Sequence, residues 1–140
     1  MEEELIKGCA FLKVDRHVDQ RGELSVLTDN LPNGFQPYRI YYVKGLNEGQ
    51  MRGSHAHRHI SQVLFVLKGK ISVTVDDGKS SAEAEIGEES EGLYMPPMIW
   101  CSIMALESGS IYMVLADGPY DKLEYISSFD EFKRLRQGFT

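Results

Sequence analysis

Short runs in which apolar and polar residues alternate extend along most of this chain. A period of two predicts β-strands with one face on a core. We interpret the following runs as strands: Gly8–Val14, Glu23–Thr28, Tyr38–Val43, Lys70–Val75, Ser80–Ile86, Leu93–Met95, Ile99–Ala105 and Ser110–Ala116, with Ser54–Leu67 as a strand pair or one long bent strand. Gly- and Asp-rich turns separate these runs, and Asn30–Pro37 is predicted to be a loop. Many short strands joined by turns predict a β-sandwich or small barrel.

The hydrophobic period changes only near the end of the chain. Phe129, Phe132 and Leu135 recur at helical spacing among charged residues, so Asp130–Gln137 is predicted to form one short amphipathic helix. Residues 1–140 are enough to form one domain with its own hydrophobic core. We therefore expect a single all-β domain with a short C-terminal helix.

The composition narrows the class of protein. Hydrophobic residues make up 42% and charged residues 26% of the chain, as in ordinary globular proteins. A net charge of −6 argues against broad nucleic-acid binding, which needs a basic surface. The only cysteines, Cys9 and Cys101, give no disulfide framework, and no apolar run approaches the roughly 20 residues of a membrane span. We expect a cytoplasmic protein with neither nucleic-acid nor membrane partners.

The candidate chemistry lies in the segment Gly49–Gly69. His55 and His57 are two residues apart, so on a strand their side chains share one face. Such a pair fits a metal site, an acid/base pair or a polar sheet surface. His59 continues the same alternation, which favours the surface interpretation. The flanking glycines favour a functional one.

The spacing Gly49–(five residues)–His55–x–His57–(four residues)–Gln62–(six residues)–Gly69 resembles the first motif of the cupin superfamily. Cupins usually carry a metal-binding Glu where this chain has Gln62. In the second motif the usual His is replaced by Cys101. Two His and one Cys still form a possible zinc set, but Gln is a poor ligand for transition metals. We expect no metal, which leaves the imidazoles free for acid/base work.

A longer series of motifs resembles one family. Arg52-Gly-Ser-His-Ala-His57, Gln62-Val-Leu, Val75-Asp-Asp-Gly78, Gly92-Leu-Tyr-Met-Pro-Pro with Trp100, and Tyr125-Ile followed by Phe129-Asp-Glu-Phe132 occur in the order seen in the nucleotide-sugar 3,4-ketoisomerases, also called the WxcM-like or FdtA-type family. The resemblance implies a cupin-type antiparallel β-roll or jelly roll, no cofactor, and a homodimer with exchanged N-terminal strands.

The resemblance also implies an activity. Family members act on dTDP-4-keto-6-deoxyglucose and move its carbonyl from C4 to C3, on the way to deoxyamino sugars of surface polysaccharides. The paired catalytic histidines of the family correspond to His55 and His57. The arginine that contacts phosphate or sugar corresponds to Arg52, whose positive charge suits a phosphate or an enolate oxygen.

Four further residues are candidates for binding the substrate. Arg21 lies in an Asp-x-Arg-Gly turn and is expected to reach the pyrophosphate. Tyr42 is expected to orient the hexose, with sheet packing as the alternative for both Tyr41 and Tyr42. Trp100 is expected either to stack on thymine or to plug the core. Cys101 stands where many members have His, which leaves open the stereochemistry of the product and whether the protein turns over at all.

Three other functions fit the same residues. One is a non-catalytic sugar-nucleotide sensor, and another is a metal-dependent cupin enzyme using His55, His57 and Cys101. A dTDP-hexulose 3,5-epimerase is a closer enzymatic alternative, although its sequence pattern differs.

Overall fold

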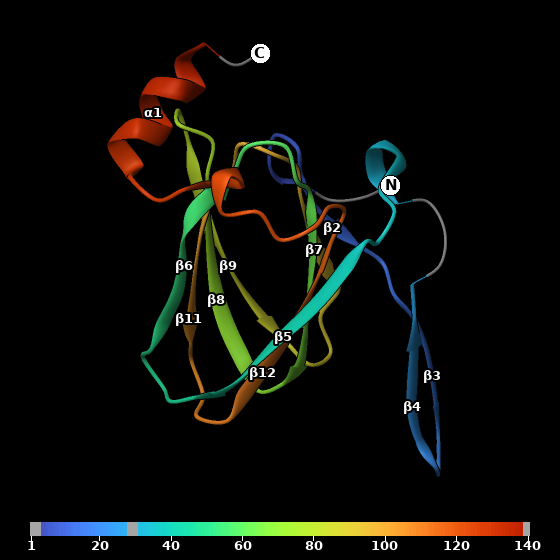
Figure 1. The fold of residues 1–140 in the computed structure, drawn as a ribbon. Coiled ribbons are helices and arrows are strands. Elements are labelled where there is room, and N and C mark those ends of the chain that lie inside the picture. The colour runs from blue at the N-terminus through green and yellow to red at the C-terminus, as the bar shows by residue number, and fades with distance from the viewer. Residues whose placement is uncertain (1–3, 28–30, 139–140) are drawn as a thin grey trace.

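The computed structural model describes residues 4–27 and 31–138 and consists mainly of two antiparallel β-sheets (Figure 1). The larger sheet has the strand order β1–β2–β10–β7–β12–β5. Its strands are β1 (Glu4–Ile6), β2 (Cys9–Leu12), β10 (Gly92–Met95), β7 (Gln62–Lys68), β12 (Ser110–Ala116) and β5 (Arg39–Leu46).

The second sheet has the order β13–β6–β11–β8–β9. Its strands are β13 (Tyr125–Ile126), β6 (Met51–His57), β11 (Trp100–Ala105), β8 (Lys70–Asp76) and β9 (Ser81–Gly87). Short 3-10 helices occupy Pro32–Gly34 (η1) and Lys122–Glu124 (η2). The expected all-β, cupin-type antiparallel roll with one short C-terminal helix is confirmed.

The two sheets enclose one main core. Ile71, Val73 and Val75 alternate along β8 as predicted, and all three are completely buried. Leu64 on β7 and Val114 on β12 belong to the same hydrophobic cluster, so both sheets contribute to it. Burial of these aliphatic side chains, at about 25 cal/mol per Å² of apolar surface, holds the sheets together.

The run Ser54–Leu67 forms two strands, β6 and β7, which belong to different sheets. The chain crosses between the sheets at residues 58–61, where the backbone N–H of Ser61 donates to Asp117 (2.8 Å). The crossing places the histidine pair on one sheet and Gln62 on the other.

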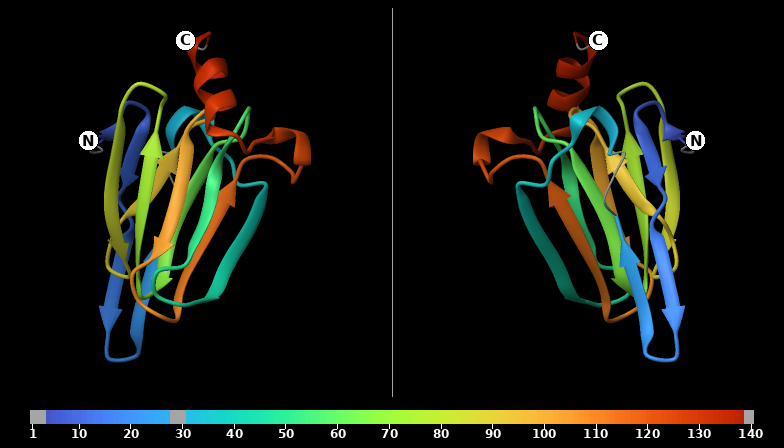
Figure 2. Two further views of the ribbon diagram at one scale, coloured as in Figure 1. Left: turned by 90° about the vertical axis from the view of Figure 1, so that its left-hand side faces the viewer. Right: turned by 90° about the vertical axis from the view of Figure 1, so that its right-hand side faces the viewer.

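Strands β3 (Asp15–Asp19) and β4 (Gly22–Val26) form a separate two-stranded ribbon that extends away from the body of the molecule (Figures 1 and 2). The turn before Glu23 and the strand after it were expected, but β3 was not. Its sequence, DRHVD, is mostly polar, and all five residues are exposed. Of the predicted elements, Thr28 and Asn30 lie outside the described residues.

Helix α1 (Phe129–Gln137) confirms the change of period at the end of the chain. The Ser128 side chain caps it by accepting a hydrogen bond from the backbone N–H of Glu131 (3.2 Å). Phe132 is fully buried beneath the helix. Within the described part of the chain, neither α1 nor any other helix has the length and hydrophobicity needed to cross a membrane.

Candidate active site

A cavity of about 910 Å³ opens between the two sheets. Its walls come from inward-facing residues of both sheets, and its rim comes from the segment that leads into α1. The lining residues include Arg39, Tyr41, Arg52, His55, Gln62, Cys101, Tyr112, Tyr120, Lys122 and Tyr125. The volume lies within the range of small-molecule sites in proteins.

His55 lines this cavity, and His57, its neighbour on the same face of β6, is buried beside it and is not among the lining residues. The His55 and His57 rings have centroids 5.2 Å apart and meet nearly edge to face. Both follow the alternation of β6, while Ala56 between them is buried on the other side. The Tyr125 ring covers the pair, with its centroid 4.8 Å from that of His55 and 4.6 Å from that of His57. The prediction that the two imidazoles project side by side is confirmed.

A β-bulge brings Arg52 to the same cavity. Arg52 and His55 are three residues apart, so a regular strand would turn them to opposite faces. On β11, Cys101 pairs with His55 and Ser102 pairs with Gly53, which leaves Ser54 as the extra residue. Gly53 and Ser54 have φ angles of 85° and 61°. A Cβ atom on Gly53 would lie 3.0 Å from the carbonyl oxygen of Cys101, so glycine suits both the angle and the space.

Burial keeps both imidazoles neutral near pH 7. It lowers the pKa of His57 to about 4, with smaller contributions from the charges of His55 and Arg39. Burial also lowers the pKa of His55, and nearby Arg52 acts in the same direction. Neither ring nitrogen of His57 has a hydrogen-bond partner among the described residues. A neutral imidazole with an unshared ring nitrogen is suited to accept a proton.

Arg39 is a functional candidate that the sequence analysis missed. Its Nε and Nη2 atoms are buried and have no hydrogen-bond partner among the described residues. The guanidinium carbon lies 5.4 Å from the ring centroid of Tyr41 and 5.7 Å from that of Tyr120. A buried cation without a counter-charge is costly unless an anion from outside completes its environment. The sequence contained one indication of this position: Arg39 and Tyr41 are two residues apart on a strand, so their side chains lie on the same face.

The structure exchanges the roles expected for the tyrosines of β5. Tyr42 does not line the cavity: it lies on the outer face of the larger sheet and is 62% exposed. Tyr41 faces the cavity, where its hydroxyl accepts a hydrogen bond from the Gln62 side chain (3.1 Å). Burial raises the pKa of Tyr41 to about 12, so its hydroxyl stays protonated. Neighbouring strand positions face opposite ways, and the residue types alone did not distinguish the two faces.

Trp100 lies away from the cavity and fills a second apolar cluster beneath α1. Its ring centroid is 5.3 Å from that of Phe129 and 5.8 Å from that of Phe132. Of its two predicted roles, this packing fits the core plug, with the ring partly buried against the cluster of Ala56, Met98, Ile126 and Phe132. The helix supplies the aromatic partners, and the alternation of β11 sends the next residue, Cys101, into the cavity instead.

Cys101 and Arg21 also occupy defined positions. Cys101 is a free thiol in the cavity wall, and burial raises its pKa to about 12, so it carries no charge at neutral pH. Arg21 lies at the tip of the β3–β4 ribbon, where it pairs with Asp19 (2.6 Å). Arg21 does not line the cavity of its own chain.

The metal-binding alternative lacks a suitable group of ligands. Among the side chains that the structure describes, no three of the types His, Cys, Asp and Glu are arranged to hold a metal ion. His55, His57 and Cys101 therefore do not form the set considered for zinc. His59 is also separate from the pair: it follows the end of β6 and contacts Glu124 instead of the cavity.

The low pKa of His57 makes a prediction about stability. In the folded protein this pKa is about 4, against an ordinary value of 6.5, so the unfolded chain binds more protons between these pH values. The contribution of the neutral His57 to the free energy of unfolding is therefore fully present above pH 6.5 and is lost as the pH falls towards 4. We expect wild type to lose about 3 kcal/mol more than His57→Asn between pH 7 and pH 4. Urea unfolding of both proteins at the two pH values measures this difference, and equal losses would contradict the burial of His57.

Comparison with known proteins is consistent with this arrangement. The family model described as WxcM-like, C-terminal (FdtA) matches residues 7–137. A curated relative, the TDP-4-oxo-6-deoxy-α-D-glucose-3,4-oxoisomerase of Aneurinibacillus thermoaerophilus, is 35% identical over 117 residues, which cover 84% of each chain.

Two solved structures share the fold over almost their full length. The WlaRB TDP-quinovose 3,4-ketoisomerase from Campylobacter jejuni is 32% identical with a TM-score of 0.85, and the match covers 92% of this chain and 99% of that one. A histidine-to-asparagine mutant of the 3,4-ketoisomerase QdtA from Thermoanaerobacterium thermosaccharolyticum, in complex with TDP-4-keto-6-deoxyglucose, is 25% identical with a TM-score of 0.88, covering 96% and 98%. The family model spans nearly the whole chain, and this protein belongs to the WxcM-like, C-terminal (FdtA) family.

Proposed function

We propose that this chain is a sugar-nucleotide isomerase that moves the keto group of dTDP-4-keto-6-deoxyglucose from C4 to C3. The observation that carries the proposal is the pair His55 and His57, of which His55 lines a cavity with two arginines and His57 is buried next to it. The family relatives named as 3,4-ketoisomerases support the same reaction and substrate class.

The reaction moves protons at two carbons and at two oxygens, and we propose that the pair carries the transfers at C3 and C4. A base removes the proton on C3, which the adjacent C4 ketone acidifies, and the electrons move to the C4 oxygen to form an enediolate. That oxygen takes up a proton. The C3 hydroxyl then loses its proton and becomes the ketone, while C4 receives a proton on carbon. The bonds made and broken balance without any oxidant or reductant.

The remaining cavity residues suit binding and charge stabilisation. We propose that Arg39 and Arg52 neutralise the pyrophosphate or the enediolate oxygen, since both are cationic and both line the cavity. Tyr41 keeps its hydroxyl proton and is proposed to orient the hexose by hydrogen bonding. Cys101 carries a neutral thiol, so we propose that it affects the shape of the cavity next to His55 and not its charge.

Incubation with dTDP-4-keto-6-deoxyglucose in deuterated water tests the activity. We expect a 3-keto product with deuterium at C4, detected by NMR and mass spectrometry, because an imidazole proton exchanges with solvent. The expected result separates the isomerase from a non-catalytic sugar-nucleotide sensor. Binding of dTDP without a 3-keto product and without deuterium at C4 would establish the sensor instead.

We further propose that the protein is a homodimer in which the β3–β4 ribbon packs across a second copy. A two-stranded ribbon is marginally stable on its own, yet Val18 is 69% and Leu24 62% exposed. The outer face of the larger sheet also presents Ile40 and Leu67 to solvent. An exchanged ribbon would cover these side chains, and it would give Arg21 a route to the partner's nucleotide.

Light scattering coupled to size exclusion tests the assembly. We expect a mass of twice 15.9 kDa for wild type and a monomer for the double variant Val18→Ser, Leu24→Ser, which removes the apolar contacts of the ribbon. Met51→Ser, at an exposed apolar residue of another strand, is the matched control and should stay dimeric. A monomeric wild type would refute the exchange.

Finally, we propose that residues 1–140 work as a single domain in the cytoplasm. Cys9 and Cys101 are both free thiols, which suits a reducing compartment.

A further inference from the structure

The segment before α1 covers the histidine pair with one aromatic ring. Tyr125 pairs with His57 across strands β13 and β6, and its ring centroid lies within 5 Å of both imidazole centroids. Strand β13 has only two residues, so backbone pairing alone gives it little stability. We infer that Glu124 is a positioning residue, which holds Tyr125 against His55 and His57. Its effect on turnover rests on the proposed function.

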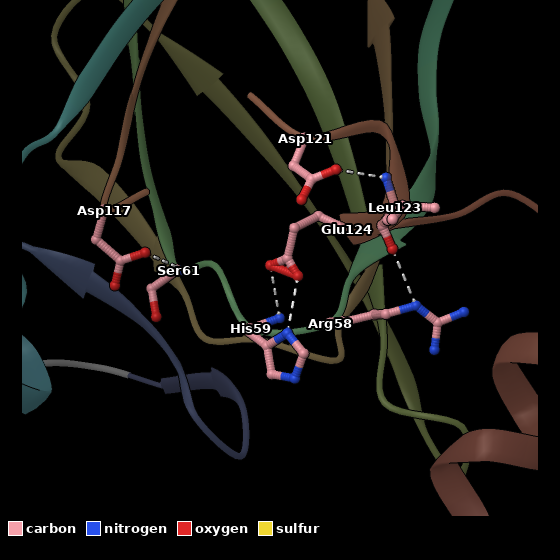
Figure 3. Close-up of polar contacts among 7 residues, drawn as sticks. All are labelled: Arg58, His59, Ser61, Asp117, Asp121, Leu123 and Glu124. Atoms are coloured by element: carbon pink, nitrogen blue, oxygen red, sulfur yellow. Dashed lines mark hydrogen bonds and ion pairs between the residues drawn. The ribbon is translucent and has the colours of Figure 1, made fainter. Parts of the chain in front are cut away.

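The Glu124 carboxylate points towards His59 in the crossing between the sheets (Figure 3), and Glu124 does not line the cavity. The residue is only 9% exposed. One carboxylate oxygen accepts the backbone N–H of His59 (3.0 Å), and the other lies 2.9 Å from the Nδ1 atom of its ring. Such donors offset the cost of burying a carboxylate. The Glu124 carboxylate therefore ties the end of η2 to His59, the second residue after the end of β6.

Backbone contacts reinforce the same connection. The N–H of Arg58 donates to the carbonyl oxygen of Glu124 (2.9 Å). The Arg58 side chain donates through Nε to the carbonyl of Leu123 (3.2 Å), as Figure 3 shows. Asp121 caps η2 by accepting the N–H of Leu123 (2.9 Å). Residues 58 and 59 thus hold residues 123 and 124, and Tyr125 is the next residue along the chain.

The backbone bond to Glu124 is expected to matter more than the bond to the imidazole. The His59 side chain is 84% exposed, and solvent-exposed pairs of this kind contribute little. The N–H of His59 belongs to the main chain, so no substitution of the His59 side chain removes it. The two carboxylate contacts can therefore be separated by mutation: Glu124→Ala loses both, Glu124→Gln keeps an acceptor for the N–H, and His59→Asn removes only the imidazole.

NMR of the imidazole protons tests the placement without depending on activity. At pH 8 the signals of His55 and His57, assigned with the variants His55→Asn and His57→Asn, carry ring-current shifts from Tyr125. The variant Tyr125→Leu provides the reference chemical shifts of the same imidazole protons in the absence of the tyrosine ring. We expect Glu124→Ala to move both signals towards the Tyr125→Leu values, while Glu124→Gln and His59→Asn stay near wild type. Unchanged signals in Glu124→Ala would overturn the inference.

Kinetics provide the second measurement. In fully folded protein, we expect Glu124→Ala to lower kcat about tenfold or more with KM changed less than threefold, because the imidazoles lose their alignment while the cationic binding residues stay in place. Glu124→Gln should restore most of the rate. Should Glu124→Ala fail to fold, Glu124→Asp, whose shorter side chain withdraws the carboxylate from the His59 N–H, is expected to show a smaller effect in the same direction.

The two measurements separate the proposals. Shifted imidazole signals in Glu124→Ala, together with a wild type that makes no 3-keto product, would support the positioning and refute the isomerase. A normal kcat in folded Glu124→Ala would refute the positioning and leave the isomerase standing.

Discussion

Asparagine in place of His57 is expected to lower kcat at least about a thousandfold while the protein stays folded. A carboxamide cannot accept and return a proton near neutral pH, so the transfer between C3 and C4 stops. His55→Asn is expected to have an effect of similar size, because the two transfers require both rings. Single-turnover assays with dTDP-4-keto-6-deoxyglucose measure the rate, and near-UV circular dichroism checks the fold.

The position of His57 explains why the fold should tolerate this change. The imidazole is 5% exposed, and its nitrogens have no hydrogen-bond partner in the described structure, so the substitution breaks no bond. His59→Asn is the matched control, because it changes an exposed histidine outside the cavity. It should keep the wild-type rate within about twofold, as surface substitutions usually do. A folded His57→Asn variant with the wild-type rate would remove the histidine pair from the mechanism.

Methionine in place of Arg39 is expected to weaken dTDP binding about a hundredfold and to leave the free protein as stable as wild type or more stable. The guanidinium has two buried nitrogen atoms without partners, a condition that costs about 1–3 kcal/mol for a neutral group and more for a charged one. Methionine fills similar space without that cost. Isothermal titration with dTDP and urea unfolding measure the two effects.

The opposite signs of these effects distinguish a binding residue from a structural one. Replacing an arginine that stabilises the fold would lower the free energy of unfolding. Replacing an arginine that binds an anion lowers only the affinity for dTDP. Arg39→Lys should recover part of the affinity, because it keeps the charge but not the planar fork. Arg134→Met on the exposed side of α1 is the matched control and should bind dTDP normally. Wild-type dTDP affinity in Arg39→Met would exclude Arg39 from the anion site.

Much of the architecture was readable from local patterns. The period of two in Lys70–Val75 placed Ile71, Val73 and Val75 on the core, and the helical spacing of Phe129, Phe132 and Leu135 located α1. The side-by-side arrangement of His55 and His57 followed from the same rule. These features depend on residues close in sequence, where backbone geometry alone determines which side chains share a face.

Other features depended on contacts between distant segments. Tyr125 covers the histidine pair although 68 residues separate it from His57, and only the pairing of β13 with β6 brings them together. Trp100 became a core plug because α1 supplies its aromatic neighbours. The crossing at residues 58–61 assigned β6 and β7 to different sheets, whereas the sequence predicted only a strand pair or one long bent strand over Ser54–Leu67.

The alternation rule therefore placed two imidazoles on one strand face beside an apolar core, and only their burial in the folded chain lowers their pKa values. It did not place the cations around them: Arg52 was predicted from its motif and not from its parity on the strand, and Arg39 was missed. Arg52 reaches the cavity only because the bulge at Gly53 and Ser54 reverses the parity of β6, and Arg39 and Tyr41 face inward only because β5 packs with that side on the other sheet. Parity within a strand is local, but a bulge and the choice of the buried face are decided by the neighbouring strands, so only the folded chain determines them.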